Sequence, residues 1–370
     1  DPVQCLKKNF CSPGHEYYWR TGHKYKNPMM DYTPCFDAAA EKFRWNERWK
    51  GWTTPSRVEG SKSYGVGFSV HSSGDPQSDE TFAYVRLEND QVMVHCVIAE
   101  CGNGQRLGVA KVAAEVLNVP LERVTVVAAD NGVNPADFGL AGSRGTITAG
   151  AAVGRAAQAA KEKLFEEASH IMHCSPEELD TKDLMVFKKD DPSVSIPWIQ
   201  ICPLYYSITG TGMIEGDFNH NNCVLNFVEV EVDRDTGLVK LTDLLSASDV
   251  GQVVNPIELK MQFEGGLGSA GMDTAQLEGH VLDPRIGRIM THNMIDYKWR
   301  PFNELPTFNT VTLETPFDTG HPFHAIGIGE ITGAAGPAAI LMAVENALGG
   351  IEINEYPVTP DVILKALGKA

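Results

Sequence analysis

The sequence lacks cysteines at the C-x-x-C spacing that is typical of iron–sulfur and zinc-ribbon sites. Its eight cysteines are scattered, which indicates free thiols in a reducing, cytoplasmic setting rather than a disulfide framework. No run of 18 apolar residues occurs, so no membrane-spanning helix is expected. Basic residues are few: 31 Lys and Arg against 48 Asp and Glu give a net charge of −17. This charge argues against nucleic acid and anionic membranes as partners.

The glycine spacing of a dinucleotide-binding fingerprint, G-x-G-x-x-G, is missing from the two glycine-rich segments that could carry it. Residues 102–108 and 327–333 both follow the longer pattern G-x-G-x-x-x-G. A nicotinamide-dependent dehydrogenase is therefore disfavoured.

The composition, 43% apolar and 21% charged over 370 residues, is that of a globular protein with two or three lobes. We expect an α+β fold with mixed sheets and packed helices. Residues 1–60 are irregular and aromatic, and are expected either to wrap a partner surface or to pack on their own chain. The remaining chain is expected to form a first lobe, 61–210, and a second lobe, 211–370.

Periodicity and turn residues predict the elements within these lobes. Strands at 63–71, 81–87 and 91–98 are expected to form one antiparallel meander, and residues 177–209 a βα unit. A strand pair joined by Asp235-Thr-Gly237 is expected at 224–233 and 238–249. The other expected elements are helices at 34–43, 108–118, 148–170, 256–272, 334–348 and 359–368, a strand at 121–128, and mixed hairpin and loop at 273–320.

A single acidic residue, Glu330, stands in a glycine-rich turn ahead of a helix pattern. Gly327 and Gly329 allow backbone to pass close to a bulky group, and no other charge lies between His324 and Glu345. A lone carboxylate in such an apolar turn is expected to have a raised pKa and is a candidate general base. A helix-capping carboxylate is the alternative, which residue type alone favours.

Two other polar segments have a functional and a structural interpretation. Ser143, Arg144 and Thr146 precede an alanine-rich helix and suit the binding of an oxyanion, but ordinary N-capping is equally compatible. His170-x-x-His173-Cys174 has the residue types of a metal site, although its place at a helix end favours a surface cluster.

These segments, in this order, resemble the C-terminal half of the molybdenum-binding subunit of the xanthine oxidase family (molybdenum hydroxylases). The joint order is more specific than any one segment, and the Gly-Ile-Gly-Glu turn before a Gly/Pro/Ala helix is the strongest match. The matching segments are residues 1–9, 65–68, 99–104, 142–146, 249–256, 262–265 and 327–330.

The resemblance implies roles for individual residues. Glu330 is expected to be the catalytic base, which takes a proton from a hydroxyl ligand of molybdenum. Gln262 is expected to bind the pterin, and no side chain is expected to bind the metal directly, because the pterin dithiolene holds it. Phe68 and Ser69 are expected beside the substrate. Further cofactor contacts are expected at Gly102, Asn103, Gly104, Gln105, Ala141, Gly142, Ser143, Arg144, Gly145, Thr146 and Gly329.

The sequence departs from the family pattern in two places. Asn103 stands where the family usually has Gln, and Gln105 is a candidate to replace that longer side chain. Residues 1–9 match a segment that lies mid-chain in full-length members. We therefore expect either a split-subunit enzyme or a piece of a longer chain, with the metal site completed by another polypeptide.

The resemblance also implies cofactors, partners and activity. The expected cofactor is molybdenum with molybdopterin in its cytosine dinucleotide form, with 2Fe-2S clusters and FAD on partner subunits. The expected partners are a second molybdopterin-binding subunit, an iron–sulfur subunit and an FAD subunit. The expected reaction oxidises a C–H bond of a heterocyclic, aromatic or aldehyde-type small molecule, with water as the oxygen source. The alternatives are reduction or hydration of a ring substrate, or a non-catalytic scaffold subunit.

Overall fold

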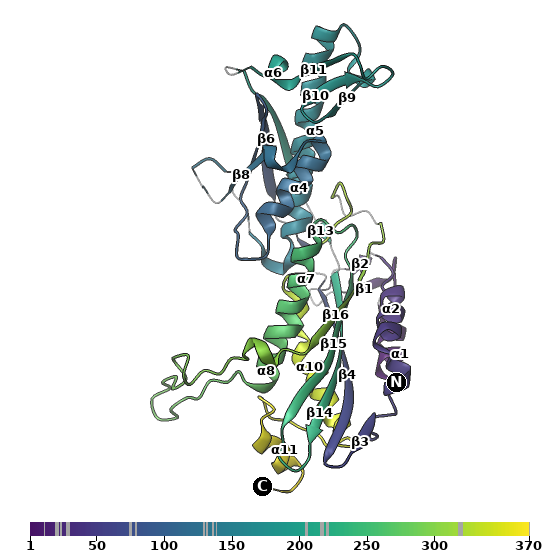
Figure 1. Ribbon diagram of the computed structural model, residues 1–370, viewed down its shortest axis with the longest axis vertical. Coiled ribbons are helices and arrows are strands. Elements are labelled where there is room, and N and C mark those ends of the chain that lie inside the picture. Colours follow the sequence, from purple (N-terminus) through teal and green to yellow (C-terminus); the bar gives the residue numbers. More distant parts are fainter. Residues whose placement is uncertain are drawn as a thin grey trace.

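Two sheets, each covered by an alanine-containing helix, organise the chain and lie one above the other (Figure 1). The computed structural model describes all residues except 11, 19–21, 23, 27–29, 74–75, 78–79, 129, 131, 135–136, 138, 204–205, 215–217, 220–221, 317–320 and 370. The α+β fold class with mixed sheets and packed helices is confirmed.

The upper sheet has the strand order β12-β6-β7-β8. The pairs β12–β6 and β6–β7 are antiparallel, and β7–β8 is parallel because the helix α4 (Gln105–Leu117) connects them. The long helix α5 (Gly145–Met172) packs on this sheet, and its buried alanines form the core with the strands. The strand bounds are β6 Thr81–Glu88, β7 Gln91–Cys96, β8 Val124–Ala128 and β12 Ile208–Ile214.

The lower sheet has the strand order β16-β15-β14-β4-β3. Helix α10 (Gly336–Ala347) covers one face, and α2 (Thr33–Phe43) lies on the other. Each face has its own hydrophobic core. The strand bounds are β3 Arg57–Glu59, β4 Lys62–Ser73, β14 Asn222–Asp233, β15 Val239–Asp249 and β16 Thr307–Leu313.

In each of the two sheets, two glycines of one strand allow the covering helix to lie close to the sheet. A Cβ built on Gly67 of β4 would lie 1.9 Å from the backbone oxygen of Ala339, and one on Gly212 of β12 would lie 2.1 Å from that of Ala152. Gly65 and Gly210 make equally close contacts two residues earlier, on the same strand face. Larger side chains at these positions would push α10 and α5 off their sheets.

This packing corrects the expected meander at 63–98. Only β6 and β7 of that segment pair with each other, whereas β4 pairs with β14 and β3 in the lower sheet. The reason is that the glycines of β4 fit under α10, which lies far later in the chain, and local alternation does not encode this contact.

Two further expectations differ from the structure. Within the segment expected as a βα unit, residues 179–197 form a small antiparallel sheet, β11-β10-β9. The expected helix at 256–272 is divided into α7 (Pro256–Gly265), a π-helical turn over the glycine-rich residues Gly266–Gly271, and α8 (Met272–Gln276). Strand β16, inside a segment expected as hairpin and loop, pairs in parallel with β15.

The N-terminal residues pack on the lower sheet rather than standing apart. Phe36, Phe43 and Trp45 are fully or almost fully buried in the core beneath the lower sheet. Wrapping of a partner by residues 1–60 stays a prediction, as does the division at 61–210 and 211–370. Residues 62–73 pair with β14 and contribute to the core of the lower sheet, so they pack with residues 211–370 rather than with the rest of 61–210.

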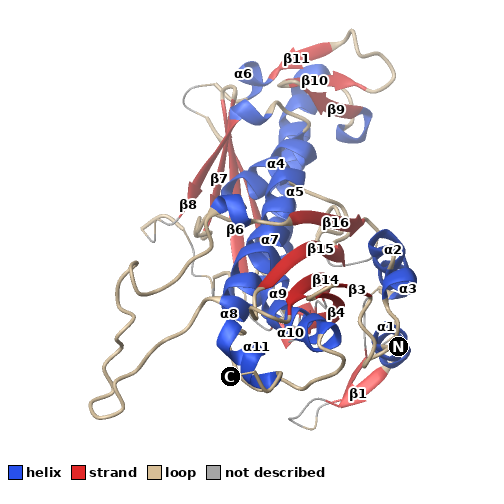
Figure 2. Cartoon of the chain, turned by 60° about the horizontal axis from the view of Figure 1, so that its bottom comes forward, coloured by secondary structure: helices blue, strands red, loops and turns tan. Residues whose placement is uncertain are grey.

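The remaining elements are short or peripheral. Residues 277–301, called the arm below, project away from both sheets with many exposed apolar side chains (Figure 2). Within the described residues, no helix has the length and apolarity to cross a membrane. The other elements are α1 Pro2–Asn9, β1 Glu16–Tyr18, β2 Lys24–Lys26, α3 Trp45–Arg48, β5 Pro76–Gln77, β9 Leu179–Lys182, β10 Met185–Lys188, β11 Ser195–Pro197, α6 Trp198–Ile201, β13 Phe218–Asn219, α9 Ile331–Ala334, α11 Pro360–Ala366, and 3-10 turns Leu121–Arg123, Ala141–Ser143, Pro176–Glu178 and Phe302–Glu304.

Candidate functional site

A pocket of about 370 Å³ lies between the upper sheet with its helices and the lower sheet with its helices. Figures 1 and 2 both show α7 below α4 and α5 at this junction. The pocket is lined mainly by residues 101–105 with the start of α4, the start of α5, residues 250–255 with α7, and residues 325–330. Segments far apart in the sequence therefore form one site between the sheets.

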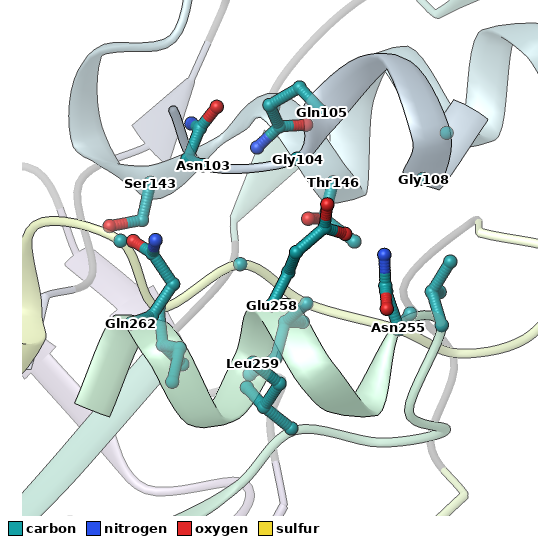
Figure 3. Close-up of a pocket in the computed structure, with 18 of the residues that line it drawn as sticks. Asn103, Gly104, Gln105, Gly108, Ser143, Thr146, Asn255, Glu258, Leu259 and Gln262 are labelled. Atoms are coloured by element: carbon teal, nitrogen blue, oxygen red, sulfur yellow. The ribbon is translucent and has the colours of Figure 1, made fainter. Parts of the chain in front are cut away.

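One face of α7 carries the polar side chains of the pocket. Asn255, Glu258 and Gln262 follow the spacing i, i+3, i+7 and point across the pocket toward the opposite wall (Figure 3). That wall contains Gly104 and Ser143. The polar stripe indicates a site for a polar ligand rather than a packing face.

Glu330 is held at the edge of the pocket by its backbone and by one carboxylate oxygen. Its Oε2 accepts a 2.8 Å hydrogen bond from the backbone nitrogen of Gly142, and its own backbone nitrogen donates to Ser143 Oγ at 2.9 Å. Its Oε1 accepts no hydrogen bond from the described residues. Glu330 stands at the N-cap position of α9, but its side chain makes no capping hydrogen bond there.

The environment of Glu330 differs from the dry turn that the sequence suggested. The residue is exposed in this chain, because its turn lies at the open side of the pocket. The turn itself is apolar and buried through Ile326, Gly327 and Ile328. The chain thus supplies the support of the carboxylate but leaves one side of it uncovered.

Gly327 explains how the turn reaches the start of α5. A Cβ on Gly327 would lie 2.1 Å from the backbone oxygen of Ser143, so only glycine permits this approach. The side-chain nitrogen of Asn222 donates a 2.8 Å hydrogen bond to the Gly327 carbonyl and holds the turn from below. By contrast, a Cβ on Gly329 would lie 3.5 Å from Gln262 Oε1, an ordinary contact distance.

The backbone N–H groups at the start of α4, where cofactor contacts were expected, already bind a carboxylate of the chain. Glu100 accepts hydrogen bonds of 3.0, 3.0 and 3.1 Å from the nitrogens of Gly102, Gly104 and Arg106. Burial acts to raise the pKa of the Glu100 carboxyl, but these N–H groups lower it below its ordinary value. A ligand in the pocket therefore meets side chains here rather than a free helix N-terminus.

Three buried polar atoms in the pocket wall lack hydrogen-bond partners within the described part of the chain. They are Asn103 Oδ1, Asn255 Nδ2 and Glu258 Oε2. Burial raises the pKa of the Glu258 carboxyl, partly opposed by the charge of Lys111 and reinforced by Glu100. Because unpartnered buried polar atoms are costly, this group is suited to a ligand that supplies the missing partners.

His321 is a buried imidazole at the back of the pocket. Its Nδ1 accepts a 3.1 Å hydrogen bond from the backbone nitrogen of Phe323, so the proton of the neutral ring resides on Nε2. Burial lowers the pKa of His321 to about 4, and His324 adds to the shift. The ring lies against Gly150 of α5, where a Cβ would be 2.4 Å from Nε2.

The structure brings most of the expected site residues together. The pocket is lined by Gly102, Asn103, Gly104, Gln105, Ser143, Gly145, Thr146, Gln262, Gly329 and Glu330. Gln105 packs on Gly145, where a Cβ would lie 2.8 Å from its Nε2. Ala141 and Gly142 lie just outside the lining, where Gly142 supports Glu330.

Three expected site residues point elsewhere. Arg144 is fully buried, and its guanidinium donates to Thr81 Oγ1 at 3.0 Å. Phe68 belongs to the aromatic core, with its ring 4.7 Å from that of Phe227, and Ser69 donates to the backbone oxygen of Ala335. Phe68 and Ser69 lie away from the pocket because β4 is an inner strand covered on both faces.

Several lining residues were not anticipated from the sequence, among them Cys101, Asn255, Glu258 and His321. The polar spacing along residues 255–262 is the signal that could have found two of them. The histidine and cysteine cluster at 170–174 forms no metal site, and no group of three metal-binding side chains occurs elsewhere in the described residues.

Comparison with known proteins identifies the family. Residues 38–306 match the family described as molybdopterin cofactor-binding domain. The aldehyde oxidoreductase molybdenum-binding subunit PaoC of Escherichia coli (strain K12) is 28% identical over 90% of this chain and 44% of its own length. The nicotine 6-hydroxylase large subunit of Paenarthrobacter nicotinovorans is 27% identical over 91% of this chain and 42% of its own length.

Solved structures show the same fold. The quinoline 2-oxidoreductase of Pseudomonas putida 86 has a TM-score of 0.82 and 24% identity, covering 100% of this chain and 50% of its own. The CO dehydrogenase of Oligotropha carboxidovorans has a TM-score of 0.84 and 20% identity, with 100% and 49% coverage. The chain therefore spans about half the length of the relatives that it matches. With two lobes of this fold around one polar pocket, it belongs to the xanthine oxidase family of molybdenum enzymes, through its molybdopterin cofactor-binding domain.

Proposed function

We propose that this chain forms half of the cofactor site of a molybdenum hydroxylase and carries its catalytic base. The observation that carries the proposal is the position of Glu330, bonded to Gly142 and Ser143 beside a polar interlobe pocket. The same pocket contains Gln262, the proposed pterin ligand.

The residues of the pocket fit a pterin cofactor. A pterin presents several ring donors and acceptors, and the wall offers unpartnered polar atoms on Asn103, Asn255 and Glu258. Gln262 adds an amide that can donate and accept. When bound, the molybdenum cofactor supplies the two-electron oxidation of the substrate, and the protein supplies binding and orientation.

In this proposal each residue has a defined task. The Gly142 N–H fixes Glu330 Oε2, so that Oε1 is the atom that accepts the proton. Ser143 accepts a hydrogen bond from the backbone nitrogen of Glu330. Gly327 packs closely against the Ser143 carbonyl and restrains its position. His321 is neutral above its lowered pKa, so it places no cation at the pocket wall.

The complete enzyme is proposed to contain further chains. This chain spans about half the length of its relatives, and we propose that a second molybdopterin-binding chain, or a further segment of a longer chain, covers the exposed side of Glu330. An iron–sulfur subunit, an FAD subunit and the cytosine dinucleotide form of the cofactor remain part of the proposal. One relative is named as a subunit of a 6-hydroxypseudooxynicotine dehydrogenase complex, which supports a multi-subunit assembly. The free thiols of the seven described cysteines support a cytoplasmic location.

The proposed substrate is a heterocyclic, aromatic or aldehyde-type small molecule, oxidised at a C–H bond with oxygen from water. The names of the relatives include aldehyde oxidoreductase, nicotine 6-hydroxylase and xanthine dehydrogenase, which supports this class. Phe68 and Ser69 are buried and do not line the interior of the cofactor pocket, and their place beside the substrate stays a prediction.

The test is an inventory of the native complex that contains this chain. We expect mass spectrometry and metal analysis to find molybdenum and a pterin in equal amounts, together with further subunits. We expect the chain expressed alone to contain no molybdenum. A purified native complex without molybdenum and pterin would contradict the proposal and favour a scaffold subunit.

A further inference from the structure

Glu258 occupies an unusual place in the pocket. Its carboxylate presses against Gly104 of the opposite wall, where a Cβ would lie 1.9 Å from Glu258 Cδ and 2.2 Å from each oxygen. The side chain therefore crosses the full width of the pocket at this point, from α7 to the loop before α4 (Figure 3). Gly104 has a φ of 73°, so its lack of a side chain serves both the turn and this contact.

No group within the described residues satisfies this carboxylate. Neither oxygen of Glu258 accepts a hydrogen bond or forms an ion pair there, and Oε2 is buried. The charged groups that face it are Lys111 of α4 and Glu100 of the preceding loop. Glu100 is satisfied by three backbone N–H groups, so Glu258 is the carboxylate in this corner that has no donor.

Two amides stand beside Glu258 with unpartnered atoms of their own. Asn255 precedes it by three residues on the same face of α7, and Asn103 adjoins Gly104 on the opposite wall. An amide can present either its donor or its acceptor by rotation about its last side-chain bond. The corner therefore offers a fixed anionic acceptor flanked by two adaptable groups.

We propose that Glu258, with Asn255 and Asn103, binds the amino-substituted edge of a pyrimidine ring in the bound cofactor. A carboxylate accepts hydrogen bonds from an exocyclic amine and repels a carbonyl oxygen in the same place. The flanking amides can then bond the adjoining ring nitrogens. This inference rests on the proposed function, and it adds a residue and a chemical selectivity to the cofactor pocket.

Two parts of a molybdopterin cytosine dinucleotide carry such an edge: the pterin ring and the cytosine base. The shared chemistry is an amine on a pyrimidine ring, and simple ligands separate the two sources. Cytidine monophosphate and uridine monophosphate differ at this amine, and so do pterin and lumazine, in which a carbonyl replaces the amine.

The experiment is isothermal titration calorimetry of the four ligands against the full, cofactor-free chain. We expect the amino member of at least one pair to bind about tenfold or more tightly than its carbonyl analogue, since a charged acceptor is involved. The pair that shows the preference identifies the part of the cofactor that lies against Glu258.

Three variants test whether the Glu258 side chain causes the preference for the amino ligand. Glu258→Gln removes the charge and is expected to reduce the preference to about twofold or less. Glu264→Gln, on the same helix but in a surface pair with Lys260, is the matched control and is expected to keep it. Glu258→Asp keeps the charge but shortens the side chain, and is expected to weaken the amine preference. It provides a second test of the role of Glu258 if Glu258→Gln folds poorly.

The inference is wrong if the wild-type chain distinguishes neither pair, or if Glu258→Gln distinguishes them as well as the wild type does. Metal analysis of the native complex separates this result from the wider proposal. Molybdenum and pterin in the complex without an amine preference leave the proposed function standing and reject the role of Glu258. An amine preference without molybdenum in the complex supports the role of Glu258 and rejects the proposed function.

Discussion

The Oε2 atom of Glu330 lies 2.8 Å from the backbone nitrogen of Gly142, a residue 188 positions earlier in the chain. A second bond, from the Glu330 nitrogen to Ser143 Oγ, joins the same two turns. The turn that carries the proposed base and the start of α5 are thus one structural unit. A substitution in either turn is therefore expected to alter the position of the other.

The two glycines of the Glu330 turn should respond differently to alanine. At Gly327 a Cβ would meet the Ser143 carbonyl at 2.1 Å, so we expect Gly327→Ala to lower the free energy of unfolding by about 1–3 kcal/mol. At Gly329 the nearest atom would be at 3.5 Å, so Gly329→Ala should change the stability by less than about 0.5 kcal/mol. Chemical denaturation of both variants is the measurement, and equal effects would contradict the described approach.

Gln262 should contribute to cofactor retention rather than to substrate affinity. Its amide points into the pocket from α7, so we expect Gln262→Ala to weaken cofactor binding about tenfold. The measurement is molybdenum and pterin content per protein in the assembled enzyme. Met261→Ala changes the neighbouring, half-exposed residue and should leave the content unchanged. Full cofactor content with only a higher KM would show that the assignment is wrong.

His321 should make the fold less stable in acid. Its folded pKa of about 4 lies below the ordinary value of 6.5, so the unfolded chain binds the proton more readily. The contribution is fully present above pH 6.5 and is lost as the pH falls toward 4, by about 3 kcal/mol in all. His321→Asn keeps an acceptor for the Phe323 N–H and should flatten this part of the stability curve.

The measurement for His321 is the free energy of unfolding between pH 7 and pH 4. His280→Asn, on the exposed arm, is the control and should follow the wild-type curve. If the free energy of unfolding of His321→Asn fell with pH as steeply as that of the wild type, other groups would cause the acid sensitivity.

Local patterns predicted the elements better than their pairing. The hairpin through Asp235-Thr-Gly237, the alanine-rich α5 and the Pro-initiated α10 lie where turn and periodicity signals put them. Strand β4 was assigned to the wrong sheet, because its partner β14 and its covering helix α10 lie far away in sequence. Glycine spacing at 65 and 67 marks a close helix contact but does not say which helix makes it.

The same limit applies to the site. The glycine turn singled out Glu330, and the family resemblance placed Gln262 and residues 102–105 in one pocket. The sequence could not show that Arg144 is directed to Thr81 or that Glu100 takes the N–H groups before α4, since both depend on side-chain direction. The exposure of Glu330 was also missed, because burial at an open edge depends on what covers it.

The central claim, that Glu330 is the catalytic base, is tested most directly by Glu330→Gln in the assembled enzyme. The amide oxygen can still accept the Gly142 N–H, so the turn and the cofactor should remain in place. The amide cannot take up a proton, and we expect turnover to fall by ~10²–10⁴-fold. Glu352→Gln, at an exposed position of the same lobe, is the control and should keep normal turnover.

Turnover and molybdenum content should be measured on the same Glu330→Gln preparation. The account predicts full molybdenum content with turnover reduced by at least ~10²-fold. Near-normal turnover at full molybdenum content would contradict it.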